Sequence, residues 1–170
     1  MAVMIMWRLA TNFILFQSCW WAAFFWQNDV LPMMAALIAL MLALSDKRKQ
    51  DILLLASLPI ALLLETSAAQ FALLQFEGAW IPWWLVLLWV SLLLTINHSL
   101  RFITRLPLWQ CFVLCWVCAP FSYLGAARFE VLSTPLPWWQ FYLVYGLLWA
   151  SAFTVIIVIN RLAGRVEDNT

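Results

Sequence analysis

Six apolar runs separated by short polar segments constrain what this chain can fold into. They lie near residues 9–27, 30–44, 52–75, 81–101, 107–127 and 137–160. A helix needs about 20 apolar residues to cross a bilayer, and all but the second run approach that length. The chain is 66% hydrophobic and only 10% charged, whereas soluble domains carry roughly 25% charged residues. We therefore predict an all-α fold, a polytopic membrane helical bundle with six transmembrane helices in a single domain over 1–170.

The second run, 30–44, is the shortest of the six. Asn28, Asp29 and Pro32 stand at its start, and the polar run 46–51 follows it. A segment of this length predicts a thin, tilted or partly re-entrant helix. A five-span alternative, in which this run does not cross, would separate Arg8 from Lys47 or break the alternation of the later runs.

Lysine and arginine in the short connecting segments predict the orientation, because these residues mark the cytoplasmic side. With the N-terminus inside, eight of the nine lie in the cytoplasm and Arg128 alone lies outside. The eight are Arg8, Lys47, Arg48, Lys49, Arg101, Arg105, Arg161 and Arg165. Tryptophans gather at both predicted membrane boundaries, as amphipathic indoles do. The pattern predicts that both termini are cytoplasmic.

The run Asn97-His98-Ser99-Leu100-Arg101 lies near the cytoplasmic end of the fourth apolar run. His98 is the only histidine, and an imidazole can act as acid, base or metal ligand. We predict Asn97, His98 and Arg101 as candidate catalytic residues and Ser99 as a substrate-binding residue. In this interpretation Arg101 holds a phosphate and His98 moves a proton. Structural hydrogen bonding, and for Arg101 an extension to lipid phosphate, are the alternatives.

Asn12 and Gln17 lie in the inner part of the first run, at a depth similar to that of His98. Polar side chains in hydrocarbon are costly and normally face the bundle interior. We therefore predict Asn12 and Gln17 as substrate-binding residues. Hydrogen bonds between helices remain the alternative.

Glu65 lies in the outer half of the third run, where the only basic residue predicted on that side is Arg128. A buried carboxylate tends to be protonated or paired. We predict a Glu65–Arg128 ion pair, with Glu130 as a competing partner, and count Glu65, Tyr123 and Arg128 among the substrate-binding residues. Gly125, in the same segment as Tyr123 and Arg128, predicts a close helix approach.

Cys111, Cys115 and Cys118 fall on one helix face, and Cys19 and His98 lie at a similar depth. Thiolates with an imidazole suit copper or zinc. Small packing residues are the alternative, and neither a pair of CxxC motifs nor a supporting carboxylate occurs at that depth, so we predict no metal and no cofactor. The net charge of +1 and the scattered basic residues predict no nucleic-acid partner.

These polar runs carry a resemblance. Asn12-Phe13 with Phe16-Gln17, the Asn97 to Arg101 run, and Pro120 to Arg128 together resemble a family of small bacterial inner-membrane proteins described as a domain of unknown function. Two positions depart from the family pattern as we read it: Glu65 stands where aspartate is expected, and Ala119 where glycine is. The resemblance implies a multi-pass protein of the bacterial inner (plasma) membrane and a companion of lipid-modifying methyltransferases.

Three functions follow from these residues. The first is an enzyme or accessory factor acting on membrane lipids or their acyl chains, alone or with another membrane or lipid-modifying protein. The second is a small transporter or exporter, gated on the outside by Glu65 and Arg128. The third is a non-catalytic membrane scaffold. We favour the first, because the most distinctive run lies at the depth of the lipid headgroups.

Overall fold

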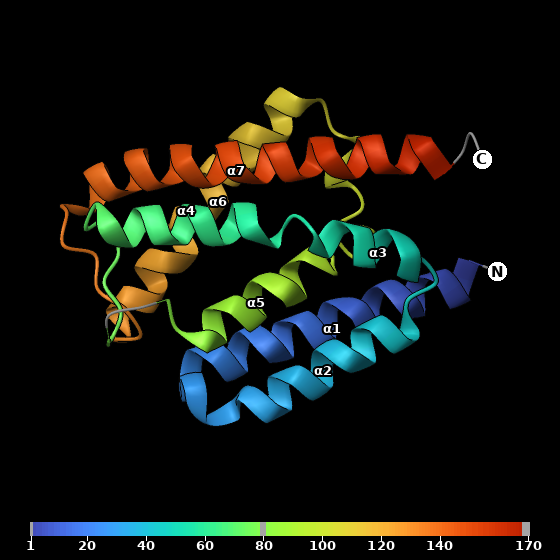
Figure 1. The fold of residues 1–170 in the computed structure, drawn as a ribbon, viewed down its shortest axis with the longest axis horizontal. Helices are drawn as coiled ribbons and strands as arrows, with labels where there is room; N and C mark the ends of the chain where they lie inside the picture. Colours follow the sequence, from blue (N-terminus) through green and yellow to red (C-terminus); the bar gives the residue numbers. More distant parts are fainter. Residues whose placement is uncertain (1, 79–80, 168–170) are drawn as a thin grey trace.

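The structure is a computed structural model that describes residues 2–78 and 81–167, and the side chains of 6–78 and 81–164. All regular secondary structure in these residues is helical (Figure 1), which confirms the predicted all-α class. The elements are α1 (Ala2–Trp26), η1 (Gln27–Val30), α2 (Leu31–Leu44), α3 (Arg48–Leu55), α4 (Leu58–Gln70), α5 (Trp83–Leu93), η2 (Ile103–Arg105), α6 (Leu108–Arg128) and α7 (Trp138–Glu167).

Successive passes of the chain alternate in direction, so that α1 begins and α7 ends at the same end of the molecule (Figure 1). Helices α1 and α2 form an antiparallel pair joined by η1, and α5 packs against both. Helices α3 and α4 follow one another along α7 (Figure 1). Helix α6 packs almost entirely against α7. Because α6 packs mainly on α7, space remains between α6 and the helices α1 and α5.

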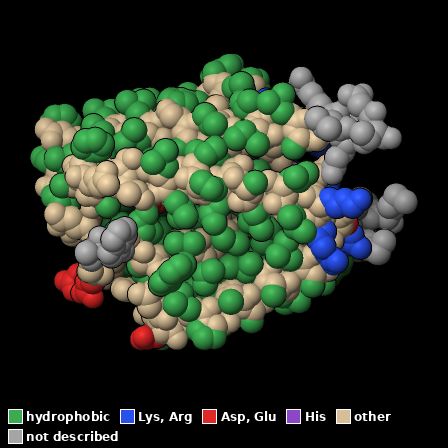
Figure 2. Space-filling model, in the orientation of Figure 1, with side chains coloured by type: hydrophobic (Ala, Val, Ile, Leu, Met, Phe, Trp, Pro, Cys, Tyr) green, Lys and Arg blue, Asp and Glu red, His purple; other side chains and the backbone are tan. Residues whose placement is uncertain are grey.

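The surface is that of a membrane protein. Large apolar side chains lie on the outside, among them Phe71 and Phe121, which are 75% and 74% exposed, and a soluble monomer rarely exposes apolar surface on this scale. Figure 2 shows basic side chains at the end where α1 begins and acidic ones at the other end. Exposed residues there include Lys47 and Lys49 at the basic end, and Asp29 and Glu77 in the turns of the opposite end.

Among the residues that the structure describes, four helical stretches are long and apolar enough to cross a membrane by length and composition. They are Met6–Leu44, Arg48–Gln70, Leu108–Arg128 and Trp138–Gly164. The first contains both α1 and α2, which fold back on each other. Helix α5 is apolar as well but shorter. The helices therefore have the character of a membrane bundle.

Two of the predicted runs are interrupted helices. The run 52–75 begins within α3, breaks at Ala56 and Ser57, and continues as α4. Pro59 explains the break, because proline has no N–H to bond the carbonyl four residues earlier. The run 81–101 contains only the 11 residues of α5, after which the chain continues in tight turns. The apolar pattern predicted the two runs but not the interruptions within them.

The close helix approach lies at Gly146, not at Gly125. A Cβ atom added at Gly146 of α7 would come within 2.5 Å of Trp116 and 2.8 Å of Pro120 on α6. A Cβ atom at Gly125 would meet nothing within 4 Å. Glycine is therefore required on α7, where it lets the two helix backbones approach.

Candidate functional site

The regular α-helix ends with α5, and residues 94–102 continue in tight turns. We call them the unwound segment, and they carry the histidine. Its backbone hydrogen bonds join residues three apart or at irregular intervals. An example of the three-residue interval is His98 N–H to Thr95 O at 3.0 Å. The Thr95 hydroxyl also donates to the carbonyl of Leu92 at 2.5 Å. Hydroxyl and amide side chains compete with the helical ladder in this way. The polar residues that define the run therefore also end the helix.

Asn12 of α1 stabilises the unwound segment by replacing hydrogen bonds that a helix would have made. Its Nδ2 donates to the carbonyl of Leu94 at 3.2 Å. Its Oδ1 accepts from the Ser99 N–H at 3.3 Å and from the Ser99 hydroxyl at 2.7 Å. Irregular backbone inside a membrane is tolerated only where such partners are supplied. Asn12 therefore fixes the position of the segment that holds His98.

Asp51 is the centre of the cluster that forms around His98. The His98 Nε2 lies 2.8 Å from Asp51 Oδ2, and Asn97 Nδ2 donates to Asp51 Oδ1 at 3.0 Å. The Ser45 hydroxyl donates to Asp51 Oδ2 at 2.5 Å and also lies 3.2 Å from His98 Nε2. Asp51 is only 1% exposed. An ionised carboxylate only accepts hydrogen bonds, and all three neighbours can donate.

The cluster continues into the last helix. Asn160 of α7 donates from Nδ2 to Asn97 Oδ1 at 3.0 Å. Together with Asp51 on α3 and Ser45 after α2, this bond joins three helices to the unwound segment. Such a network holds the imidazole in one orientation, which a proton-transfer site requires.

A polar pocket of about 220 Å³ opens beside His98 at the basic end of the bundle. Its polar lining residues are Arg8, Thr11, Asn12, Ser45, Asp46 and His98. At its mouth Arg8 and Asp46 form an ion pair at 3.2 Å, with both side chains about half exposed. The other carboxylate oxygen of Asp46 lies 3.6 Å from His98 Nδ1. The imidazole thus stands between a buried carboxylate and an accessible one.

This arrangement can transfer protons between a bound molecule and the imidazole. A protonated ring could donate toward both carboxylates, and a neutral ring could accept a proton from a ligand. Asp51 fixes the ring, as the orienting carboxylate does in acid–base sites. Arg8 offers a cation to an anionic group at the mouth of the pocket.

Four of the predicted site residues lie together in the structure, whereas Gln17 and Arg101 lie outside this group. Asn12, Asn97, His98 and Ser99 form or adjoin the cluster. Gln17 lines a different, apolar cavity. Arg101 is half-buried and is not among the residues that line the polar pocket. Asn12, Gln17 and His98 therefore do not share one cavity.

Glu65 has different partners from the one predicted. It is fully buried and accepts hydrogen bonds from Trp89 Nε1 at 2.9 Å, the Tyr123 hydroxyl at 2.6 Å and the Tyr145 hydroxyl at 3.1 Å. The predicted ion pair with Arg128 was wrong, since Arg128 is exposed at the end of α6 and has no ion pair in the described part of the chain. Neutral donors satisfy this carboxylate, whereas a guanidinium at a helix end reaches water more cheaply.

Sequence reasoning missed Asp51, because it was placed in the polar segment before the third run. The missing signal was helical spacing. Asp51 lies about one turn before Leu54 on α3, and both are buried. The others missed are Arg8 as a pocket residue, Ser45, Asp46 and Asn160, which reach the cluster only through tertiary packing.

The four cysteines are free, with Cys118 exposed and the other three buried. Across the residues that the structure describes, no group of three or more His, Cys, Asp or Glu side chains is placed to hold a metal ion.

Comparison with known families decides the relationship. A model of a family described as a protein of unknown function, DUF2878, matches residues 9–155. The chain belongs to this family. The match confirms the resemblance seen in the sequence, and it takes in Asn12, Asp51, His98 and Glu65. No curated protein and no solved structure matches the chain.

Proposed function

We propose that this DUF2878 family member is an enzyme, or the accessory factor of a lipid-modifying enzyme, that performs acid–base chemistry on the polar part of a membrane lipid. The observation that carries the proposal is the 2.8 Å contact between His98 Nε2 and the buried Asp51, beside a pocket that opens at the basic end of an apolar bundle. Membrane lipids are the molecules whose polar groups meet a membrane protein at this level.

In this proposal the residues have separate roles. His98 accepts a proton from the lipid's polar group and returns it, or passes it to water at the pocket mouth. Asp51 is a positioning residue that holds the ring through Nε2. Arg8 binds an anionic group such as a phosphate, which takes the place of Asp46 in the ion pair with Arg8. Asn12 and Ser99 hold the backbone that carries His98.

The decisive experiment compares lipid extracts of a deletion strain complemented with wild-type protein or with His98→Gln. Glutamine can keep a hydrogen bond to Asp51 but cannot carry a proton at neutral pH. A catalytic His98 therefore predicts that the lipid change made by the wild type is lost in His98→Gln. A histidine that only joins helices predicts that glutamine preserves the change.

Asp51→Asn should also abolish the lipid change, and Asp29→Asn is its matched control. Asp29 is exposed in the turn between α1 and α2 at the opposite end, so the same chemical change there should leave the lipid profile as in the wild type. Protein abundance in the membrane is measured for every variant. An unchanged lipidome in the deletion strain itself would contradict the proposal.

We further propose six membrane crossings in the bacterial inner membrane, with both termini in the cytoplasm. Alternating passes and a basic end that contains the start of α1 support this arrangement. Cysteines introduced at Lys49 and at Glu77, in a Cys118→Ser background, should react with a membrane-impermeant maleimide from opposite sides. Reaction of both from the same side would contradict the six-span count.

A further inference from the structure

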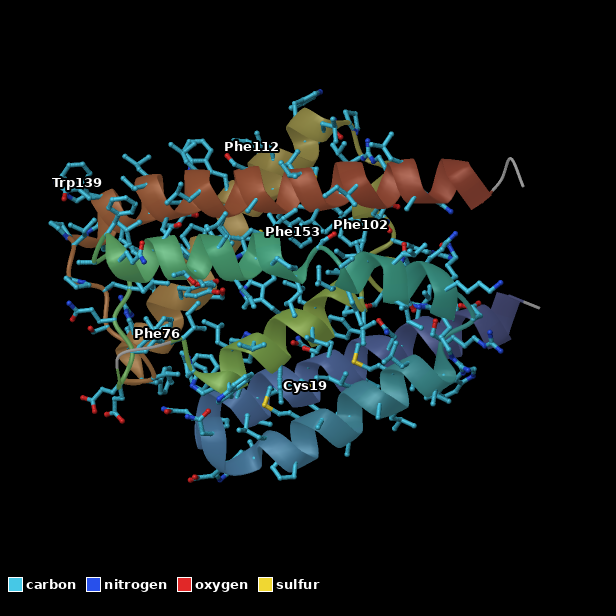
Figure 3. All side chains as sticks on the ribbon, in the orientation of Figure 1. Cys19, Phe76, Phe102, Phe112, Trp139 and Phe153 are labelled. Carbon is cyan, nitrogen blue, oxygen red and sulfur yellow. The ribbon has the colours of Figure 1, made fainter. Side chains whose placement is uncertain are left out.

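The polar pocket beside His98 carries both signs of charge at its mouth. Arg8 is the only lysine or arginine among the lining residues that the structure describes, and Asp46 is paired with it at 3.2 Å. Arg48 is close in sequence, but its guanidinium donates to two backbone carbonyls in the last turn of α2. Nitrogen-bearing side chains project from this end of the bundle, whereas Trp139 lies at the opposite end (Figure 3). A ligand in the pocket therefore meets one cation and one accessible carboxylate.

The Arg8–Asp46 ion pair restricts the charge of a ligand. An anionic group that takes Arg8 leaves the Asp46 carboxylate without its cation, and Asp46 then faces the ligand as a like charge. A cationic group that takes Asp46 leaves Arg8 without its anion in the same way. A ligand that carries both charges replaces one ion pair with two. The pair therefore favours a zwitterionic ligand over a ligand with either charge alone.

The second carboxylate oxygen of Asp46 brings a cationic group next to the imidazole. This oxygen, Oδ1, lies 3.6 Å from His98 Nδ1, while Oδ2 is paired with Arg8. His98 Nε2 is engaged with Asp51 at 2.8 Å, so Nδ1 is the ring nitrogen left for a ligand. A primary ammonium has several N–H groups, so it can donate to Asp46 and to a neutral imidazole at the same time.

The pocket is also lined by exposed apolar side chains, which favour a lipid as the source of the ligand. Trp7 is 70% exposed and Leu44 is 52% exposed, and both line the pocket. Indoles favour the headgroup zone of a membrane, and their faces attract ammonium groups. The volume of about 220 Å³ is below the roughly 300–1,000 Å³ typical of sites for whole small molecules. The pocket therefore suits a headgroup whose acyl chains stay in the bilayer.

We infer that the pocket binds a phospholipid whose headgroup carries a phosphate and a primary ammonium, with the phosphate on Arg8 and the ammonium between Asp46 and His98. The inference names a substrate class for the acid–base function proposed above, and it rests on that function. In the tautomer that donates Nε2–H to Asp51, His98 Nδ1 accepts a proton from the ammonium. The N–H bond breaks, its electron pair stays on the nitrogen of a neutral amine, and Asp51 holds the imidazolium that forms.

Native mass spectrometry of the purified protein measures the headgroup preference. The protein is incubated with an equimolar mixture of phosphatidylethanolamine, phosphatidylcholine and phosphatidylglycerol with identical acyl chains, so that only the headgroup differs. Wild type should retain phosphatidylethanolamine about fivefold over each of the others, which corresponds to about 1 kcal/mol, the upper range for a half-exposed ion pair. Equal retention of phosphatidylglycerol would overturn the zwitterionic ligand, and equal retention of phosphatidylcholine would overturn the primary ammonium.

Two variants separate the two charges. Asp46→Asn should make retention of phosphatidylethanolamine and phosphatidylglycerol about equal, because a phosphate on Arg8 no longer meets a carboxylate. Arg8→Gln should lower retention of all three lipids, since each carries a phosphate. The matched controls are Asp29→Asn at the opposite end and Arg105→Gln, which is exposed and does not line the pocket. Both controls should keep the wild-type pattern, and an unchanged preference in Asp46→Asn would overturn the assignment.

Free phosphoethanolamine distinguishes a soluble ligand from a lipid, because it carries the same two charged groups. If the protein retains it as well as the lipid at the same concentration, a membrane lipid as the source is overturned. The assay measures binding without turnover, whereas the acid–base function is measured by the lipid profile of the His98→Gln strain. A lost headgroup preference would therefore overturn this inference alone, and an unchanged lipid profile would overturn the acid–base function alone.

Discussion

Asp51 and Glu65 are both buried carboxylates, yet they are satisfied in different ways. Asp51 meets an imidazole, an amide and a hydroxyl, and its histidine partner lines a pocket with a half-exposed ion pair at its mouth. Glu65 meets one indole and two phenols, and all three of these donors come from apolar helices. His98 opens the first cluster to a pocket at the basic end. Glu65 itself is fully buried, and two of its donors, Trp89 and Tyr123, line the apolar cavity.

The comparison teaches that burial of a carboxylate does not identify a site by itself. A functional acid–base group needs a partner that exchanges protons near neutral pH and a path by which a ligand reaches it. The Asp51 cluster contains an imidazole that lines a pocket. The Glu65 cluster has one indole and two phenols as donors to a fully buried carboxylate, and its geometry is that of a connection between α4, α5, α6 and α7.

The largest effect is expected from Glu65→Ala. This change leaves Trp89, Tyr123 and Tyr145 without their acceptor and opens a cavity, so the free energy of unfolding should fall by about 3 kcal/mol. The measurement is the midpoint of SDS-induced unfolding in mixed micelles. Glu65→Gln retains one acceptor oxygen and is the control, with a smaller loss. Equal stability of the alanine variant and the wild type would mean that the Glu65 cluster is not structural.

A smaller loss is expected from Asp51→Asn. The asparagine NH₂ must face either the Asn97 NH₂ group or the pair of Ser45 and His98, which would then have to accept hydrogen bonds where they now donate to Asp51. The free energy of unfolding should fall by about 2 kcal/mol. The same titration, run beside Asp29→Asn, measures it. A loss greater than that of Glu65→Ala would reverse the comparison, because the open cluster would then be the main structural one.

The smallest effect is expected from Tyr123→Phe. Glu65 keeps Trp89 and Tyr145 as donors, and single hydrogen bonds in membrane proteins contribute about 0.6 kcal/mol on average. A loss of that order is expected in the same unfolding assay. Tyr142→Phe offers a comparison outside the cluster, since its hydroxyl bonds only the Val117 carbonyl at the bundle surface. A Tyr123 effect as large as that of Glu65→Ala would show that this phenol alone holds the carboxylate.

Much of the fold could be predicted because lipid imposes strong rules on sequence. The helical class and the positions of α2, α6 and α7 followed from apolar runs and their flanking polar residues. The break between α3 and α4 was missed, although Pro59 marks it, because hydropathy averages over such interruptions. The unwound segment after α5 was missed for a related reason: its polar side chains were read for chemistry and not for their competition with the backbone.

The sequence by itself determined that this chain is an apolar helical bundle. It also predicted that Asn12, Asn97, His98 and Ser99 lie at one depth and need hydrogen-bond partners there, because polar groups in hydrocarbon are costly. Only the tertiary structure decided which partners they find. Asp51 joins His98 across 47 positions of sequence, and Glu65 turns to two tyrosines and a tryptophan instead of Arg128. Hydropathy records the cost of burying a polar group, whereas the partner that offsets this cost depends on helix rotation and packing.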